Sequence, residues 1–214
     1  MNTGTTQQPT GLGGPAAVAT AIGAGLLAGG LTAFGQAWLP DALRSLANSS
    51  GSWSLLAFAL ALVARHRGGA ALSGFAALAC MLLGYVLVNE ARGYPSSTGL
   101  VLFWTAAAVV AGPLLGAGAH LLRWSRGRAA IWGIGAISGV LVGEGAYGLL
   151  HIADTTYPPY WWGEIVVGVL LLLAAHAWRF RRWSTTATAA LLTAAVAAAF
   201  VLAYSNGGTL MQLL

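Results

Sequence analysis

Three residues of one apolar stretch have the types and spacing of a chemical site. Glu144, Tyr147 and His151 stand at i, i+3 and i+7, which places a carboxylate, a phenol and an imidazole on one face of a helix. The stretch covers residues 133–162, begins with a ladder of glycines and ends in a loop rich in aromatic residues. Such groups bind cations or exchange protons, so this stretch is the first candidate for a functional site.

Glu144 is expected inside a membrane-spanning helix. A charge there costs on the order of 3 kcal/mol or more unless it is solvated or paired, so the carboxylate is expected to face the protein interior. Arg92 is the natural counter-ion for Glu144, or for Glu90 on its own helix. The alternative is that the helix ends early and Glu144 lies at the membrane interface. Glu164, close to Trp161, has the same two interpretations.

Aromatic residues surround the second acid, in the segment Tyr157 to Trp162. As a wall beside carboxylates they suit a small organic cation, through cation–π contact and charge. The alternative is an ordinary aromatic belt at the level of the lipid headgroups. The predicted binding set has eight members: Glu90, Arg92, Glu144, Tyr147, His151, Trp161, Trp162 and Glu164.

A catalytic use of the same acids is the second interpretation. An intramembrane enzyme acting on a lipid or isoprenoid would use Glu144 and Glu164 as acid and base, with His151 next to Asp154 as a further candidate. A histidine at a helix end more often caps the helix or lies at the interface, so no catalytic residue is assigned and binding ranks ahead of catalysis. The metal-binding spacings H-x-x-H, H-E-x-x-H and E-x-x-H do not occur, and neither a metal nor a cofactor is predicted.

The elements that must position these residues are membrane helices. Of the 214 residues, 57% are hydrophobic and 7% are charged, whereas about a quarter of a soluble domain is charged. The sequence therefore predicts an all-α, polytopic transmembrane bundle whose partner is the lipid bilayer. The net charge of +5 does not indicate nucleic-acid binding, because the arginines form short clusters between apolar segments.

Seven membrane spans are predicted, and six spans plus a re-entrant segment at residues 39–64 are the alternative. The seven cover residues 15–38, 46 or 53 to 64, 70–90, 99–122, 129–150, 161–178 and 184–204. They form a single domain, 15–205, between a disordered tail, 1–14, and a short C-terminal tail, 206–214. Three sets of small residues are expected to let helices pack closely: Gly25 with Gly29, Gly112 with Gly116, and Gly135 with Gly139 and Gly143.

The arginines predict the orientation. Eight of the ten lie in the turns that follow the second, fourth and sixth spans: Arg65, Arg67, Arg123, Arg126, Arg128, Arg179, Arg181 and Arg182. The positive-inside rule places these turns in the cytoplasm, and hence the N-terminus inside and the C-terminus outside a plasma membrane. The five acids all fall on the outer side: Asp41, Glu90, Glu144, Asp154 and Glu164.

Four segments together resemble a family of small multi-spanning membrane proteins from GC-rich bacteria whose function is unassigned. They are NSSGSW at 48–53, NEARGY at 89–94, GEGAYG at 143–148 and YWWGE at 160–164. The resemblance implies a membrane fold and no activity. A fainter similarity, through residues 21–33 and GPLLG at 112–116, is to the substrate-binding subunits of energy-coupling-factor vitamin transporters. Those subunits usually have six helices, so a seventh span counts against it.

Three function classes follow from these features. The first is a small-molecule binding or transport component with an outward-facing acidic and aromatic site, whose ligand is a small organic cation or a lipid-like molecule. The second is the intramembrane enzyme, and the third is a non-catalytic partner subunit of another membrane protein. Acids that converge on a cavity open to the outside favour the first, and two carboxylates facing a sealed apolar cavity favour the second.

Overall fold

In a computed structural model the chain is described over residues 11–125 and 127–213, with side chains up to residue 206. Arg126, residues 1–10 of the predicted N-terminal tail and Leu214 lie outside the described residues. The described chain consists of helices, which confirms the all-α class. The long helices are α1 (Gly14–Trp38), α4 (Arg67–Ala91), α5 (Thr98–Trp124), α6 (Ala129–His151), α7 (Pro158–Ala175) and α8 (Trp183–Leu213). The short ones are α2 (Asp41–Arg44), the 3-10 turn η1 (Ser45–Ala47), α3 (Ser50–Ala61) and the π-helical turn η2 (His176–Phe180).

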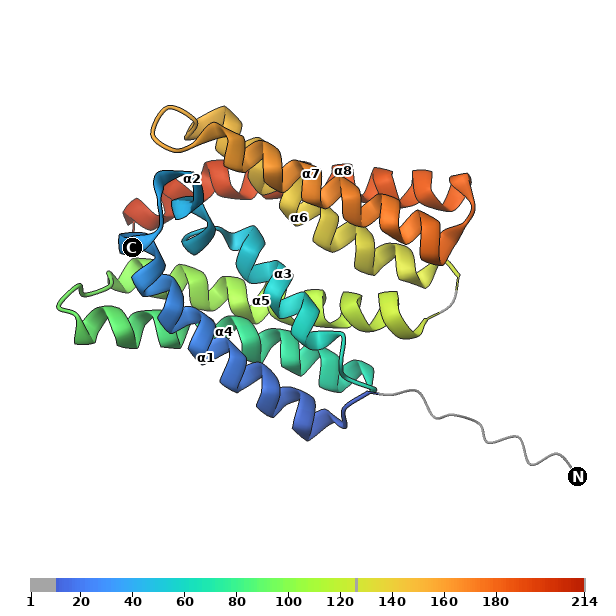
Figure 1. Cartoon of the computed structure of the whole chain (residues 1–214), viewed down its shortest axis with the longest axis horizontal. Helices are drawn as coiled ribbons and strands as arrows, with labels where there is room; N and C mark the ends of the chain where they lie inside the picture. The colour runs from blue at the N-terminus through green and yellow to red at the C-terminus, as the bar shows by residue number, and fades with distance from the viewer. Residues whose placement is uncertain (1–10, 126, 214) are drawn as a thin grey trace, which may run out of the picture.

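The helices form two groups of three, with α3 between them (Figure 1). In one group α4 packs between α1 and α5, and in the other α6 packs between α7 and α8. Contacts between α5 and α6 join the groups, and α3 lies against α4, α5 and α6. Helix α6, which carries Glu144, is the most enclosed of the long helices. In an apolar stretch of 18 residues in α6, 67% of the residues are buried, whereas the corresponding share is 22–39% in the other long helices.

Within the described residues six helices are long and apolar enough to cross a membrane, so the count of seven spans is not confirmed. The predicted second span is shorter than expected, because α3 has only 12 residues. At about 1.5 Å per residue it covers about 18 Å of a ~30 Å hydrocarbon core. The polar residues before it form α2 and η1 instead of extending the helix.

The segment containing α3 nevertheless meets both ends of α1. Near the end of α1, Gln36 Nε2 donates to Asn48 Oδ1 at 2.7 Å. Before its start, the Leu12 N–H donates to the Val63 carbonyl at 2.7 Å. Residues 48–63 therefore run antiparallel to α1 and reach from one end of it to the other.

Glycines bring the long helices close together, as their spacing predicts. A Cβ on Gly29 of α1 would overlap the Met81 carbonyl of α4, and one on Gly116 of α5 would overlap the Ala70 carbonyl. On α6, a Cβ on Gly139 would lie 2.5 Å from the Val196 Cβ of α8. These close approaches hold the helices of each group together where lipid provides no hydrophobic drive between helices.

The basic turns lie together at one end of the bundle. Arg123 Nη1 donates to the Leu62 carbonyl at 2.9 Å, and Arg179 Nη2 donates to the carbonyls of Arg123 at 2.9 Å and Ser125 at 2.6 Å. Helix α2 and the loops 92–97 and 152–157 lie at the opposite end (Figure 1). Helix α8 runs to Leu213 and ends at that second end.

Candidate functional site

The carboxylates of Glu144 on α6 and Glu164 on α7 meet at the first turn of α3. The Ser49 hydroxyl lies 2.9 Å from Glu144 Oε2 and 3.0 Å from Glu164 Oε1. Glu144 also accepts from the backbone N–H groups of Ser50, at 2.8 Å, and Gly51. Glu144 is 5% exposed and Glu164 is 6% exposed, so both face the interior of the bundle and neither is a surface residue.

The local sequence explains why α3 begins at the two acids. Ser49 has an extended backbone and its Oγ accepts from the Ser52 N–H at 3.0 Å, which makes it the N-cap of α3. The first N–H groups of a helix have no partner within the helix and attract an anion, a role that Glu144 fills here. Gly51 leaves the room: a Cβ there would lie 2.6 Å from Glu144 Oε2 and overlap Glu164 Oε1.

No basic side chain in the described part of the chain forms an ion pair with either carboxylate. The expected pairing of Arg92 with Glu144 or Glu90 is wrong. The Arg92 guanidinium donates to the Ala33 carbonyl and lies over the rings of Phe34, at 4.6 Å, and Tyr94, at 5.4 Å. A carbonyl at the end of α1 and two aromatic faces satisfy this cation, so it does not reach the acids.

The hydrogen bonds of the pair are unequal. Three donors reach Glu144, whereas Ser49 alone reaches Glu164 Oε1, and Glu164 Oε2 is buried without a partner among the described residues. A buried carboxylate oxygen without a donor is costly. Glu164 therefore has an unfilled acceptor position.

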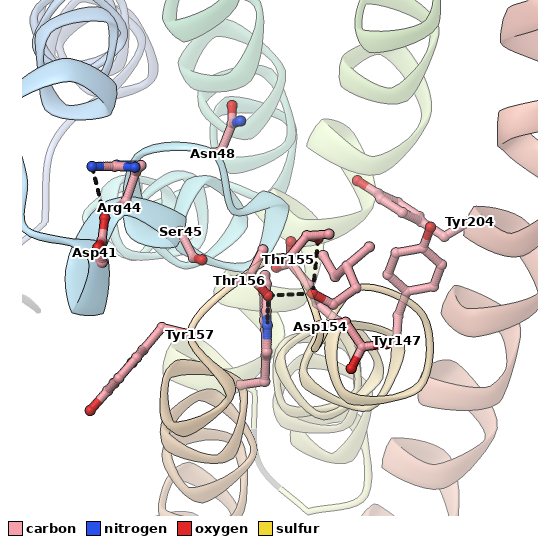
Figure 2. A pocket seen from close by; sticks show the side chains of 13 residues that line it. Asp41, Arg44, Ser45, Asn48, Tyr147, Asp154, Thr155, Thr156, Tyr157 and Tyr204 are labelled. Atoms are coloured by element: carbon pink, nitrogen blue, oxygen red, sulfur yellow. Dashed lines mark hydrogen bonds and ion pairs between the residues drawn. The ribbon is translucent and has the colours of Figure 1, made fainter.

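A polar cavity of 670 Å³ lies beside Glu144 (Figure 2). Tyr147 and Tyr204 stand at one side of it, with ring centroids 5.3 Å apart, and Asp41 and Arg44 of α2 stand at the other. The Arg44 guanidinium pairs with Asp41 at 2.8 Å. The loop after α6 completes the wall with Asp154, Thr155 and Thr156.

A second cavity, of 460 Å³, lies beside Glu164 and is mostly apolar. It lies on the other face of α2 and η1, whose Ala42, Leu43 and Leu46 contribute to its wall. Residues 41, 44, 45 and 48 of the same segment line the polar cavity. The α2–η1 segment is thus an amphipathic partition between a cavity that many polar and charged side chains line and a cavity that is mostly apolar, and one carboxylate of the pair stands on each side.

A family model described as a family of unknown function, DUF6518, matches residues 8–209. The chain belongs to the DUF6518 family. This membership confirms the resemblance to a family without an assigned function, while the GC-rich bacterial source and the fainter similarity to vitamin-transporter subunits stay predictions. No curated protein and no solved structure matches the chain.

Two more of the predicted residues of this DUF6518 protein line the polar cavity, Tyr147 and Trp161. Trp161 is 4% exposed, packs against Gly148 of α6 and donates from Nε1 to Thr156 Oγ1 at 2.8 Å. It is therefore part of the cavity wall and does not belong to a surface belt.

The other predicted residues lie away from the pair. His151, the last residue of α6, is exposed; its ring stacks on Tyr147 at 4.8 Å and its Nε2 lies 3.2 Å from Ser205 Oγ. Trp162 is 59% exposed. Glu90 is exposed and accepts from the Ser96 N–H at 3.1 Å, close to the separate cavity that Arg92 lines.

Three residues of the site were not among the sequence candidates: Ser49, Gly51 and Tyr204. A signal for Ser49 exists in the sequence, because it directly precedes the apolar segment 50–61 and an N-cap serine is common at such a place. No signal in the sequence links Tyr204 to the acids, since α8 is otherwise Ala-rich scaffold.

Proposed function

We propose that this protein is a membrane-embedded binding or transport component, and that it binds a cation at the pair Glu144 and Glu164. The observation that carries the proposal is that two buried carboxylates share one hydroxyl and have no basic partner in the described chain. Buried ionisable groups in membrane proteins usually mark the path of a substrate or an ion.

The charge balance of the pair supports a cation as its occupant. The N-terminus of a helix carries roughly half a positive elementary charge. The first turn of α3 therefore offsets at most a fraction of the two negative charges when both acids are ionised. A cation or protons must supply the remainder, and an ammonium group supplies charge and hydrogen-bond donors at once.

We infer that the basic end of the bundle faces the cytoplasm, so that the N-terminus is inside and the carboxylate pair lies on the outer side of the plasma membrane. The clustering of the arginine turns at one end supports this orientation through the positive-inside rule. In the same arrangement α2, η1 and α3 together form a seventh crossing of the membrane, which consists of short helical pieces. Residues 48–63 reach from one end of α1 to the other.

Catalysis on a lipid is the second candidate, because Glu164 also lines an apolar cavity. A ligand recovered chemically unchanged after incubation with the purified protein, as judged by mass spectrometry, supports binding, and a product of altered mass supports catalysis. A role as a partner subunit alone would need no buried carboxylate pair.

Thermal unfolding of the purified protein in a neutral detergent tests the proposal. The probe is methylammonium chloride, which carries a positive charge and three N–H donors, with sodium chloride at equal ionic strength as the reference salt. At about a hundredfold excess over Kd, a ligand that binds only the folded state raises Tm by on the order of 5 °C. The shift is expected in the wild type and to be lost in Glu164→Gln and Glu144→Gln.

Glu90→Gln is the matched control, because Glu90 is an exposed glutamate that takes no part in the pair. It should keep the full shift. Equal shifts in all four proteins would show that the pair does not bind the probe, and the proposed function would then be wrong.

A further inference from the structure

We propose that the occupant of the carboxylate pair is an amphiphilic amine, with its ammonium group at Glu164 and its hydrocarbon chain in the apolar cavity beside α7. This inference rests on the proposed function and specifies the class of ligand. Two independent features carry it: the unfilled acceptor on Glu164, and the division of the site into a polar and an apolar cavity by α2 and η1.

The buried oxygen of Glu164 indicates a donor that the described chain does not supply. Glu164 is 6% exposed, its Oε1 accepts from Ser49 and its Oε2 has no partner. An ammonium group has N–H donors and a positive charge, and so fulfils both needs of this side chain. A neutral alcohol would supply a donor and leave the charge unbalanced.

The cavity beside Glu164 is suited to hydrocarbon. Its volume of 460 Å³ lies within the range of small-molecule sites. Nine of its twelve lining residues are apolar or aromatic, and the larger ones include Leu43, Leu46, Leu55, Leu141, Tyr160 and Val167. A hydrophilic cation would leave this surface without a partner, whereas an alkyl chain would cover it.

The rim of this cavity points to the lipid as the route of entry. Leu43 and Leu46 of the α2–η1 partition are 47% and 45% exposed, and Val167 of α7 is 40% exposed. Exposed apolar side chains at a cavity mouth suit contact with acyl chains. Asp41 and Arg44 on the opposite face of the partition line the polar cavity, so the water-facing side is separate. An amphiphile that enters from the membrane reaches Glu164 without crossing the polar cavity.

Chain length is the variable that tests this proposal. Thermal shifts and the derived Kd values are compared for butylammonium and octylammonium, with 1-octanol as the neutral probe of equal chain length. Burial of four more methylene groups is expected to tighten binding by at least about tenfold. Octylammonium should therefore give the larger shift, and 1-octanol should give little.

Filling the apolar cavity should remove the advantage of the longer chain. Leu55→Trp and, as a second filling variant, Val167→Phe should bind octylammonium no better than butylammonium. The matched control is Leu102→Trp, since Leu102 is 54% exposed on α5 and lines neither cavity. It should keep the wild-type difference. Partition into the detergent would give the same difference in every variant, so loss of the difference in the filling variants alone excludes partition as its cause.

Two results would overturn this inference and leave the proposed function standing. One is equal affinity of butylammonium and octylammonium in the wild type while methylammonium still gives a shift that depends on Glu164. The other is a full chain-length effect in both filling variants. Absence of any shift with all three ammonium ions would overturn the inference and the proposed function together.

Discussion

Glu144 and Glu164 accept hydrogen bonds from one and the same Ser49 hydroxyl, at 2.9 and 3.0 Å. A hydroxyl carries a single proton, so it donates fully to only one of them at a time. Glu144 keeps two backbone donors when Ser49 turns away, and Glu164 keeps none. The two acids are therefore unequal: Glu144 holds the structure of the site together, and Glu164 is the acid free to change partners.

The two amide variants should differ in stability for this reason. In Glu144→Gln an amide NH₂ replaces an oxygen that accepts from a backbone N–H, which should cost about 1–3 kcal/mol. In Glu164→Gln the amide oxygen still accepts from Ser49 and the NH₂ takes the place of the unpartnered oxygen, so stability should be equal or higher. Thermal unfolding without added cation measures the stability of both variants. Equal losses of stability would contradict the different roles of the two acids.

Removal of the shared donor should cost more than removal of an ordinary N-cap. Ser97→Ala is the comparison, because Ser97 caps α5 by accepting from the Leu100 N–H at 3.3 Å and contacts no acid. Loss of a cap costs about 0.5–2 kcal/mol. Ser49→Ala should lose this and, in addition, the single donor of Glu164. Chemical unfolding should therefore give a larger loss for Ser49→Ala, and equal values would mean that Ser49 acts only as a cap.

A methyl group at position 51 should disrupt the pair. The Cβ of Gly51→Ala would meet Glu144 Oε2 and Glu164 Oε1, so the two carboxylates must move away from the first turn of α3. Gly163→Ala is the control one residue from Glu164, since a Cβ there meets nothing within 4 Å. Cation-induced thermal shifts should vanish in Gly51→Ala and persist in Gly163→Ala.

The packing of α1 on α4 offers a comparison of single methyl groups within one helix. Gly29→Ala would place its Cβ on the Met81 carbonyl, whereas Gly23→Ala would meet nothing within 4 Å. Helix propensity alone favours alanine over glycine by up to about 1 kcal/mol, so Gly23→Ala should be neutral or stabilising. Gly29→Ala should lower Tm clearly. Equal Tm values would mean that α1 does not pack closely on α4.

The inferred orientation can be tested with reporter fusions. Fusions after Arg67, Gly127 and Arg182 should report the cytoplasm, because these residues belong to the basic end of the bundle. A fusion at the C-terminus should report the outside, because α8 ends at the opposite end (Figure 1). A cytoplasmic C-terminus would contradict the proposed seventh crossing.

The sequence predicted the parts of this fold that depend on local pattern. The long apolar helices, the glycine contacts of Gly29, Gly116 and Gly139 and the interior position of Glu144 all follow from hydropathy, spacing or the cost of a buried charge. These features involve a helix and its immediate surroundings, so the chain itself carries enough information.

The predictions that were wrong concern contacts between residues that are distant in the chain. Arg92 was predicted to pair with Glu144, but its guanidinium donates to the Ala33 carbonyl. The sequence alone does not indicate that a backbone carbonyl competes with the acid for this side chain. His151 has the correct spacing from Glu144, but as the last residue of α6 it extends beyond the helices that cover Glu144. Helix α3 is short because it begins at the place where the two acids lie.

The N-cap of α3 also constrains the order of biosynthesis. Its partners Glu144 and Glu164 follow Ser49 by 95 and 115 residues, so a ribosome has completed α4 and α5 before it makes either acid. A helix of 12 residues is too short to be held across the bilayer alone while the chain is still growing. The hydrogen bonds that join Ser49 to both acids can therefore form only after Glu164 of α7 has been made, so this part of the interior is completed late in the synthesis of the chain.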